Sequence, residues 1–233
     1  MLQRERTAAL KQLPILAELS DDALARVAQA CTWSHYPEGK QIVRYLDRST
    51  DVFFLLAGKA RVNVYSSKGK AVVFVDLKPA TMFGEIAAID RRPRSASIHA
   101  LESCSIASLS TDAFEKLMLR EPSVAVATLR HVAADVRRLS ERVLEFSTLV
   151  VQNRIHAELL RLAGEVGAQA VDVALSPAPS LSDIADRIST HREAVSRELS
   201  RLAGIGLLRR EGGNLRITNV TKLAEFVAEA KGE

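Results

Sequence analysis

Hydrophobic and polar positions follow one regular pattern over residues 121–162, a stretch with no proline after Pro122. Apolar residues recur at alternating spacings of four and three, which is the a/d repeat of a helix that packs along a narrow seam. Charged residues flank the seam. The pattern predicts one helix of about forty residues, longer than most helices of globular proteins. The seam consists of Val132, Val136, Leu139, Val143, Phe146 and Val150.

A seam this narrow requires a partner helix, and the simplest partner is the same helix in a second copy of the chain. We therefore interpret residues 121–163 as a dimerisation helix with a hinge at its end. The alternative interpretation is a long helix that is buried against its own domain.

Before this helix the pattern is different. Residues 8–30 predict short helices, with Ser20 as the cap of the second one. Beyond residue 32, short runs rich in β-branched and aromatic residues alternate with turn residues, which is typical of strands. Many short strands at this spacing indicate a sandwich or barrel of the jelly-roll kind. The predicted strands are residues 41–43, 52–56, 61–65, 71–77, 95–100 and 105–109, followed by a helix over 111–119.

After the long helix, residues 164–180 contain glycines, two prolines and several small residues, which mark a domain boundary. Two helices are predicted over 182–188 and 192–202, with a tight turn at Ser189 and Thr190. Strands over 207–210 and 214–218 form a hairpin around Gly212 and Gly213, and a helix over 221–230 closes the chain. The short connection forces the two helices to cross steeply, which is the helix-turn-helix arrangement, and the hairpin makes it winged.

Together these patterns predict an α+β protein. We expect an N-terminal β jelly-roll domain over residues 1–120, the long dimerisation helix over 121–163, and a C-terminal winged helix-turn-helix domain over 164–233.

Composition and charge narrow the class of protein. The chain is 47% hydrophobic with a formal charge of +4, so it is globular, and its mild basic balance permits a nucleic acid as partner. Two cysteines, Cys31 and Cys104, cannot supply the four ligands of a typical iron–sulfur cluster. Five charged residues interrupt the first twenty positions, so no signal peptide is expected, and no run of about eighteen apolar residues exists. We therefore expect a cytoplasmic protein without a membrane span.

The second helix of the helix-turn-helix carries the candidate DNA-binding residues. In such units the N-terminal part of this helix enters the major groove, where arginine can bind guanine and glutamate can accept from cytosine. An alternative role for Glu193 is the helix start, because Thr190 and Glu193 have the spacing of a capping box. Residues 180–233 hold nine Lys or Arg against eight Asp or Glu, so charge alone does not favour DNA. The groove-facing candidates are His191, Arg192, Glu193, Ser196 and Arg197.

Residues 82–96 hold the second candidate site. A glycine before a short helix lets backbone N–H groups approach a phosphate closely. Arg94 could bind that phosphate through two N–H groups, Ser95 adds a hydroxyl donor, and Glu85 can accept from a ribose hydroxyl.

The order His-Arg-Glu-Ala-Val-Ser-Arg-Glu-Leu from His191 resembles the recognition helix of the Crp/Fnr family of bacterial transcription regulators. In that resemblance Arg192, Glu193 and Arg197 match the base-reading residues of the cyclic-AMP-responsive branch, and Ser196 matches a serine of the oxygen-responsive branch. The resemblance implies palindromic DNA sites with half-sites near TGTGA, with TTGA-type sites as the alternative. Ser189 occupies a turn position where the family often has glycine.

The segments Phe-Gly-Glu-Ile-Ala and Arg-Arg-Pro-Arg-Ser-Ala likewise resemble the phosphate-binding cassette of the family's cyclic-nucleotide-binding domain. The resemblance implies cyclic AMP as the allosteric ligand, and double-stranded DNA, a second copy of the chain and RNA polymerase as partners. Counting along the long helix places Leu139 and Ser140 where the cyclic-AMP-responsive branch has two hydroxyl residues that meet the adenine. The residues implied for the nucleotide are Gly84, Glu85, Ile86, Arg94, Ser95, Ala96, Leu139 and Ser140.

Other functions stay open at this point. Cyclic GMP, no nucleotide or another signal are alternatives to cyclic AMP, and a cyclic-nucleotide-binding module could act on a partner protein instead of DNA. An enzyme is not expected, because the five histidines are scattered singly, so the sequence predicts no metal site, and it contains no Ser/His/Asp motif.

Overall fold

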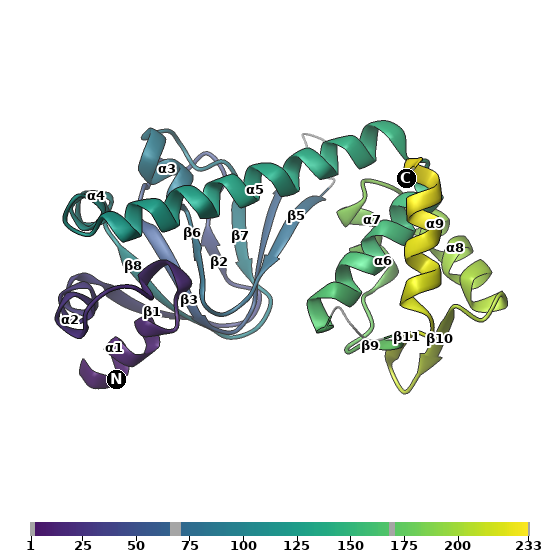
Figure 1. Cartoon of the computed structure of the whole chain (residues 1–233), viewed down its shortest axis with the longest axis horizontal. Coiled ribbons are helices and arrows are strands. Elements are labelled where there is room, and N and C mark those ends of the chain that lie inside the picture. The colour runs from purple at the N-terminus through teal and green to yellow at the C-terminus, as the bar shows by residue number, and fades with distance from the viewer. Residues whose placement is uncertain (1–2, 66–70, 168–170, 233) are drawn as a thin grey trace. The chain divides into compact units, whose positions relative to one another are not determined.

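The structure, a computed structural model, describes residues 3–65, 71–167 and 171–232 (Figure 1). The described residues form two compact units. The first unit consists of the residues up to Tyr65 together with Val73–Val136, and the second consists mainly of Arg137–Glu233. Within the described residues, no helix combines the length and apolar character that crossing a bilayer requires.

The first unit begins with helical segments: α1 (Gln3–Lys11), the 3-10 turn η1 (Pro14–Leu16) and α2 (Asp21–Ala30). The prediction that Ser20 caps a helix is confirmed, because its side-chain oxygen accepts from the backbone N–H of Ala23 at 3.2 Å. Leu10, Leu16 and Leu24 are fully buried and join a hydrophobic core with the strands that follow.

In the described residues, eight strands form two four-stranded sheets in the orders β1-β8-β3-β6 and β2-β7-β4-β5. The six predicted strands are confirmed. Two were missed: β1 is half exposed and polar, and β6 has only three residues, so neither shows a clear period of two. The strands are β1 (Thr32–Tyr36), β2 (Gln41–Val43), β3 (Val52–Ala57), β4 (Ala60–Tyr65), β5 (Ala71–Leu77), β6 (Thr81–Phe83), β7 (Ser97–Ala100) and β8 (Cys104–Leu109).

Strand β3 contributes side chains to two hydrophobic cores. Val52 and Phe54 belong to the core shared with the N-terminal helices, whereas Phe53 and Leu55 belong to the core shared with β7 and β8. The two sets alternate because successive side chains of a strand point to opposite faces. Each face of β3 is therefore covered, and the strand is buried along most of its length.

The prediction of one continuous helix over residues 121–162 is wrong. After α4 (Thr111–Arg120), the chain forms α5 (Pro122–Thr148) and α6 (Val151–Gly167), with Leu149 and Val150 outside both. The hydroxyl groups of Ser147 and Thr148 each donate to the carbonyl four residues back, at 2.8 Å, a bond that often bends helices. Leu149 is then buried while Val150 stays exposed. The a/d pattern does not detect this break because it continues through it.

The second unit contains α6, α7 (Leu181–Arg187), α8 (Arg192–Gly204), α9 (Val220–Lys231) and a sheet in the order β10-β11-β9. The predicted hairpin is confirmed as β10 (Leu208–Glu211) and β11 (Asn214–Ile217). Gly212 and Gly213 both have positive φ, as a two-residue hairpin turn requires. Strand β9 (Val173–Leu175) pairs with β11 inside the stretch interpreted as a boundary. Residues 168–170 of that stretch lie outside the described residues.

Candidate DNA interface and ligand cradle

Helix α8 presents the predicted DNA-binding residues on one face. Its apolar residues Val195, Leu199 and Leu202 are buried in the core of the second unit. On the other side of the helix, Ser196 is half-buried and the remaining candidates are exposed: His191, Arg192, Glu193 and Arg197. The exposed set lies at the N-terminal end of the helix, which is the end that enters the major groove in helix-turn-helix units.

The capping-box interpretation of Glu193 is wrong for this structure. The N-cap is His191, with extended φ and ψ of −110° and 147°, so Glu193 lies at the second helical position and not the third. Thr190 is buried and its backbone N–H donates to the carbonyl of Ala185. Among the described residues, His191 makes no capping hydrogen bond through its side chain. Glu193 is therefore left exposed at the start of the helix.

The turn between α7 and α8 depends on Ser189. This residue has a φ of 52°, in the left-handed region that glycine adopts without strain and that costs other residues about 1–2 kcal/mol. Ser189 therefore adopts the left-handed backbone conformation of the glycine that is common at this position. The turn keeps the helix-turn-helix geometry.

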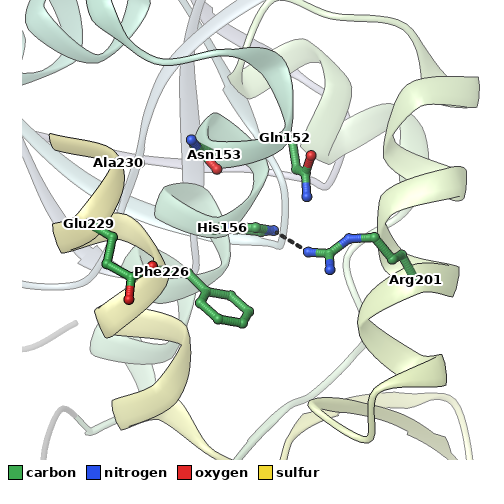
Figure 2. A pocket seen from close by; sticks show the side chains of 7 residues that line it. All are labelled: Gln152, Asn153, His156, Arg201, Phe226, Glu229 and Ala230. Carbon is green, nitrogen blue, oxygen red and sulfur yellow. Dashed lines mark hydrogen bonds between the residues drawn. The ribbon is translucent and has the colours of Figure 1, made fainter.

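Buried polar contacts fix α8 to α6. Nε2 of His156 lies 2.6 Å from a carboxylate oxygen of Glu198, and Arg201 donates to the same carboxylate at 2.7 Å. Burial alone would raise the pKa of Glu198, but hydrogen bonds from Arg201 and His156 outweigh it, so the pKa lies below its ordinary value. Figure 2 shows His156 and Arg201 in the wall of a pocket of about 380 Å³ between α6, α8 and α9.

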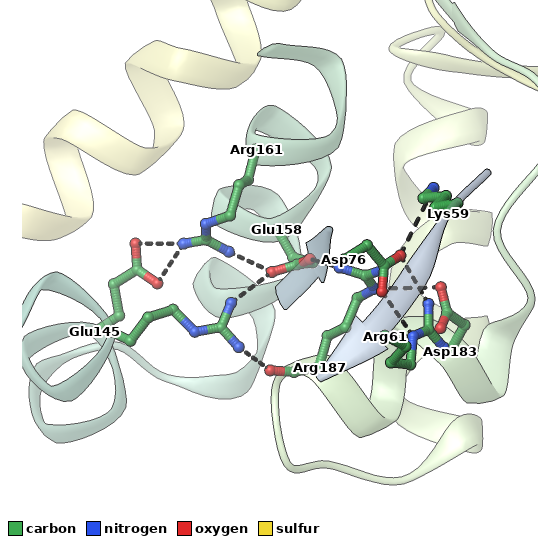
Figure 3. Close-up of polar contacts among 9 residues, drawn as sticks. Lys59, Arg61, Asp76, Glu145, Glu158, Arg161, Asp183 and Arg187 are labelled. Carbon is green, nitrogen blue, oxygen red and sulfur yellow. Dashed lines mark hydrogen bonds and ion pairs between the residues drawn. The ribbon is translucent and has the colours of Figure 1, made fainter. Parts of the chain in front are cut away.

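A second polar cluster joins the end of α5 to α6 and α7 (Figure 3). Glu158 is fully buried and pairs with Arg142 at 2.8 Å, with Arg187 at 3.4 Å and with Arg161. Arg142 also donates to the backbone carbonyl of Arg187, and Arg161 pairs with Glu145. Removing one partner from a buried ion pair typically costs about 3–5 kcal/mol. The cluster therefore ties the last turns of α5 to the helix-turn-helix.

In the first unit, the cradle predicted for the ligand forms around α3 (Glu85–Asp90). Gly84 precedes this helix with a φ of 81°. A Cβ at this position would lie 2.8 Å from Nη1 of Arg94 and 3.0 Å from the carbonyl oxygen of Asp51. Both the backbone conformation and the close approach of these atoms require glycine.

Arg94 is the centre of this cradle. Its side chain is buried and donates from Nε to Ser49 at 3.2 Å, from Nη1 to the carbonyl of Gly84 at 2.9 Å and from Nη2 to that of Asp51 at 2.8 Å. It also lies over the ring of Phe53. Removing this side chain would therefore leave two carbonyls and a hydroxyl without their donor. Burial lowers the pKa of Arg94, and nearby carboxylates act against this effect.

Glu85 is also buried, and it faces α5. Burial is the main cause that raises its pKa, and the charge of Asp135 acts in the same direction. One possible ligand atom each from Glu85, His131 and Asp135 lies within 4.8 Å of the other two. Neither His131 nor Asp135 was among the predicted site residues. Their spacing of four on a helix was the signal in the sequence, because it places them on one face.

The other residues predicted for the nucleotide are placed as follows. Ile86 and Ser95 are exposed beside the cradle, and Ala96 is buried. Leu139 and Ser140 are exposed on α5 but belong to the second unit, so their approach to the ligand stays a prediction.

Comparisons with known proteins identify the family of each of the two domains. The cyclic nucleotide-binding domain family matches residues 33–121, and the Crp-like helix-turn-helix domain family matches residues 153–226. The cyclic AMP receptor protein of Thermus thermophilus is 30% identical over 196 residues, which cover 82% of this chain and 86% of the relative. The chain belongs to the Crp/Fnr family.

Further members of the Crp/Fnr family match along most of the chain. A CRP-like cAMP-activated global transcriptional regulator of Mycobacterium tuberculosis is 24% identical over 217 residues, covering 92% of this chain and 96% of the relative. Among solved structures, the c-di-GMP responsive global regulator CLP of Xanthomonas campestris has a TM-score of 0.72 at 17% identity, over 85% of this chain and 99% of that one. The chain is thus a DNA-binding transcription regulator and not an enzyme, and its fold is that of the family.

In this family member the predicted seam lies on the surface of α5. Val132 is half-buried, and the seam residues that follow it in α5 are exposed: Val136, Leu139, Val143 and Phe146. Leu129 is 69% exposed and lies one heptad before Val136, so it extends the seam toward the start of the helix. Sequence reasoning missed this residue, although it fits the same repeat.

Proposed function

We propose that the protein is a homodimeric regulator that binds cyclic AMP in the cradle around Arg94 and then binds palindromic DNA sites with TGTGA-like halves. One observation carries the ligand part of the proposal. Arg94 is 2% exposed, and its hydrogen-bond partners are one hydroxyl and two carbonyls, with no carboxylate pairing with it in the described part of the chain. Carboxylates lie near this buried cation but none of the described ones pairs with it, so part of its desolvation cost stays uncompensated, and a bound anion would remove that cost.

A cyclic phosphate fits this cation. Arginine has five N–H groups, and the three described bonds use one on each nitrogen, so Nη1 and Nη2 each keep one N–H. Two such groups can bind two oxygens of one phosphate. The protein bonds already hold the guanidinium in place, so little side-chain freedom is lost when the anion binds.

The base of the nucleotide is a separate question. The names of the relatives from Mycobacterium tuberculosis and Thermus thermophilus refer to cyclic AMP, which supports cyclic AMP as the ligand. In this proposal Glu85 accepts from the ribose hydroxyl and Ser140 accepts from the adenine amino group. Leu139 cannot supply the second hydroxyl. Losing one neutral hydrogen bond costs only about 0.5–1.5 kcal/mol, so we expect cyclic AMP to bind with reduced discrimination against cyclic GMP.

The exposed seam supports a dimer through α5. A row of exposed apolar residues at a/d spacing has the form of one half of a coiled coil, and a second copy supplies the other half. In such a dimer the two copies of α8 would lie about 34 Å apart, one turn of duplex. Ligand and DNA would favour the same arrangement, so each would tighten the binding of the other. RNA polymerase would be the partner at promoters.

Calorimetric titration of the full chain tests the ligand assignment. We expect cyclic AMP to bind more tightly than cyclic GMP or c-di-GMP, and Leu139→Thr to increase the preference for cyclic AMP over cyclic GMP. The absence of heat for all three at about 1 mM would contradict a nucleotide ligand. The protein would then be a member of the family that works without a ligand or responds to another signal.

A further inference from the structure

Three side chains with metal-binding atoms meet beside the cradle. Glu85 begins α3, and His131 and Asp135 lie on one face of α5, four residues apart. Each offers one atom within 4.8 Å of the other two. All three belong to the first unit, so their meeting depends on the packing of one compact body.

Two of these groups have few partners among the described residues, and one of them has a shielded nitrogen with none. The carboxylate of Glu85, which is 5% exposed, accepts a hydrogen bond from the backbone N–H of the same residue. No side chain among the described residues donates to it. Nε2 of His131 is shielded from solvent and, in the part of the chain that the structure describes, has no hydrogen-bond partner. A buried polar atom without a partner costs about 1–3 kcal/mol, so Nε2 of His131 points to a ligand that would bind it beside the carboxylate of Glu85.

We propose that Glu85, His131 and Asp135 bind a divalent transition-metal cation, for which Zn²⁺ has the best-fitting chemistry. One imidazole and two carboxylates are a donor set that zinc accepts, with a fourth position left for water or another ligand. Zinc–ligand bonds of about 2.0–2.2 Å place tetrahedral ligand atoms about 3.3–3.6 Å apart. The ligand atoms therefore need to approach one another by up to about 1.5 Å, which rotamer adjustment on two helices can provide.

The inference does not rest on the proposed nucleotide. It shares Glu85 with that proposal, so an ion and a ribose hydroxyl would exclude each other at this carboxylate.

The test uses chelator-treated full-length protein without nucleotide, so that its failure is separate from the failure of the cyclic AMP assignment. Zn²⁺ binding is measured by calorimetry, and Co²⁺ is added as a spectroscopic substitute. We expect one ion per chain, with the visible absorption of cobalt in a low-symmetry N/O site. Asp135→Asn and His131→Gln should each weaken binding by about 100-fold or more, since losing a ligand costs at least as much as losing a group that supports one.

His35→Gln is the matched control, because this exposed histidine lies on β1 and is bonded to Ser103. It should leave the affinity unchanged. Circular dichroism shows whether each variant is folded, and Asp135→Asn replaces a half-buried side chain by one of equal size, so it keeps the test valid if His131→Gln does not fold. The absence of zinc binding at about 100 μM, or an unchanged affinity in folded Asp135→Asn, would overturn the proposal.

Discussion

Nη1 of Arg94 donates to the carbonyl oxygen of Gly84 at 2.9 Å, and the same nitrogen lies 2.8 Å from the place where a Cβ on residue 84 would stand. The residue before α3 and the buried guanidinium are thus fitted to each other. Glycine provides both the left-handed backbone and the space, and arginine fills that space with a group that satisfies the local carbonyls. Changes on either side should disturb the cradle.

Gly84→Ala should therefore destabilise the first unit and weaken nucleotide binding. The methyl group would displace Arg94, and the positive φ adds about 1–2 kcal/mol. Gly39→Ala is the matched control: its φ is 77°, yet a Cβ there would meet no described atom within 4 Å. Unfolding midpoints in urea and cyclic AMP titrations of both variants measure the difference. Equal effects of the two substitutions would show that the contact with Arg94 is unimportant.

Arg94→Leu should lower stability as well as ligand affinity. The leucine leaves two partly buried carbonyls and a hydroxyl without their donor, at about 1–3 kcal/mol for each group that water does not reach. The neighbouring Arg92→Leu, at an exposed position, should change neither quantity. Urea unfolding followed by circular dichroism measures the loss. A variant as stable as the wild type would mean that these hydrogen bonds do not hold the cradle.

Arg197→Ala should reduce binding to cognate DNA by about 1–3 kcal/mol and relax the preference at one guanine position. Arg197 is exposed on the face of α8 opposite its buried residues. Arg210→Ala, on the exposed side of the wing, should instead weaken cognate and random DNA alike, as expected for a phosphate contact. Binding curves of both variants on the cognate and the random duplex, at one salt concentration, distinguish a base contact from a phosphate contact. If Arg197→Ala also weakened both equally, Arg197 would not read a base.

Glu198→Gln should destabilise the second unit at neutral pH and lose this effect in acid. The folded pKa of Glu198 lies below the ordinary value of 4.5, so its ionisation adds stability above that pH and the contribution disappears as the pH falls through the folded pKa. Unfolding midpoints of wild type and variant should therefore converge in acid. Exposed Glu193→Gln is the control and should match the wild type at neutral pH. If the unfolding midpoints of wild type and Glu198→Gln differed by the same amount at every pH, the ion-pair assignment would be contradicted.

Local patterns predicted most of the fold. Short runs of β-branched and aromatic residues between turn residues identified β3 and β8, and a glycine pair identified the wing. Such signals lie in residues that are neighbours in the sequence. The break at Leu149 was not predictable in this way. It depends on the burial of one leucine, while the a/d repeat continues through the exposed Val150.

The sites were predicted less completely than the fold. Motif order selected Arg94 and Glu85, but burial and hydrogen bonding decide what each can do, and these depend on distant carbonyls such as that of Asp51. His156 and Glu198 are 42 residues apart in sequence and meet only through the packing of α6 and α8. No spacing rule connects such pairs.

The proposed control of DNA binding by cyclic AMP predicts one result above all others. Fluorescence anisotropy should be measured on a labelled duplex with two TGTGA half-sites arranged as a palindrome, and on a scrambled duplex, with and without cyclic AMP at fixed salt. We expect cyclic AMP to tighten binding to the palindrome about tenfold or more and to leave the scrambled duplex nearly unchanged. Equal affinity for the palindrome with and without cyclic AMP, or equal affinity for the two duplexes, would contradict the account.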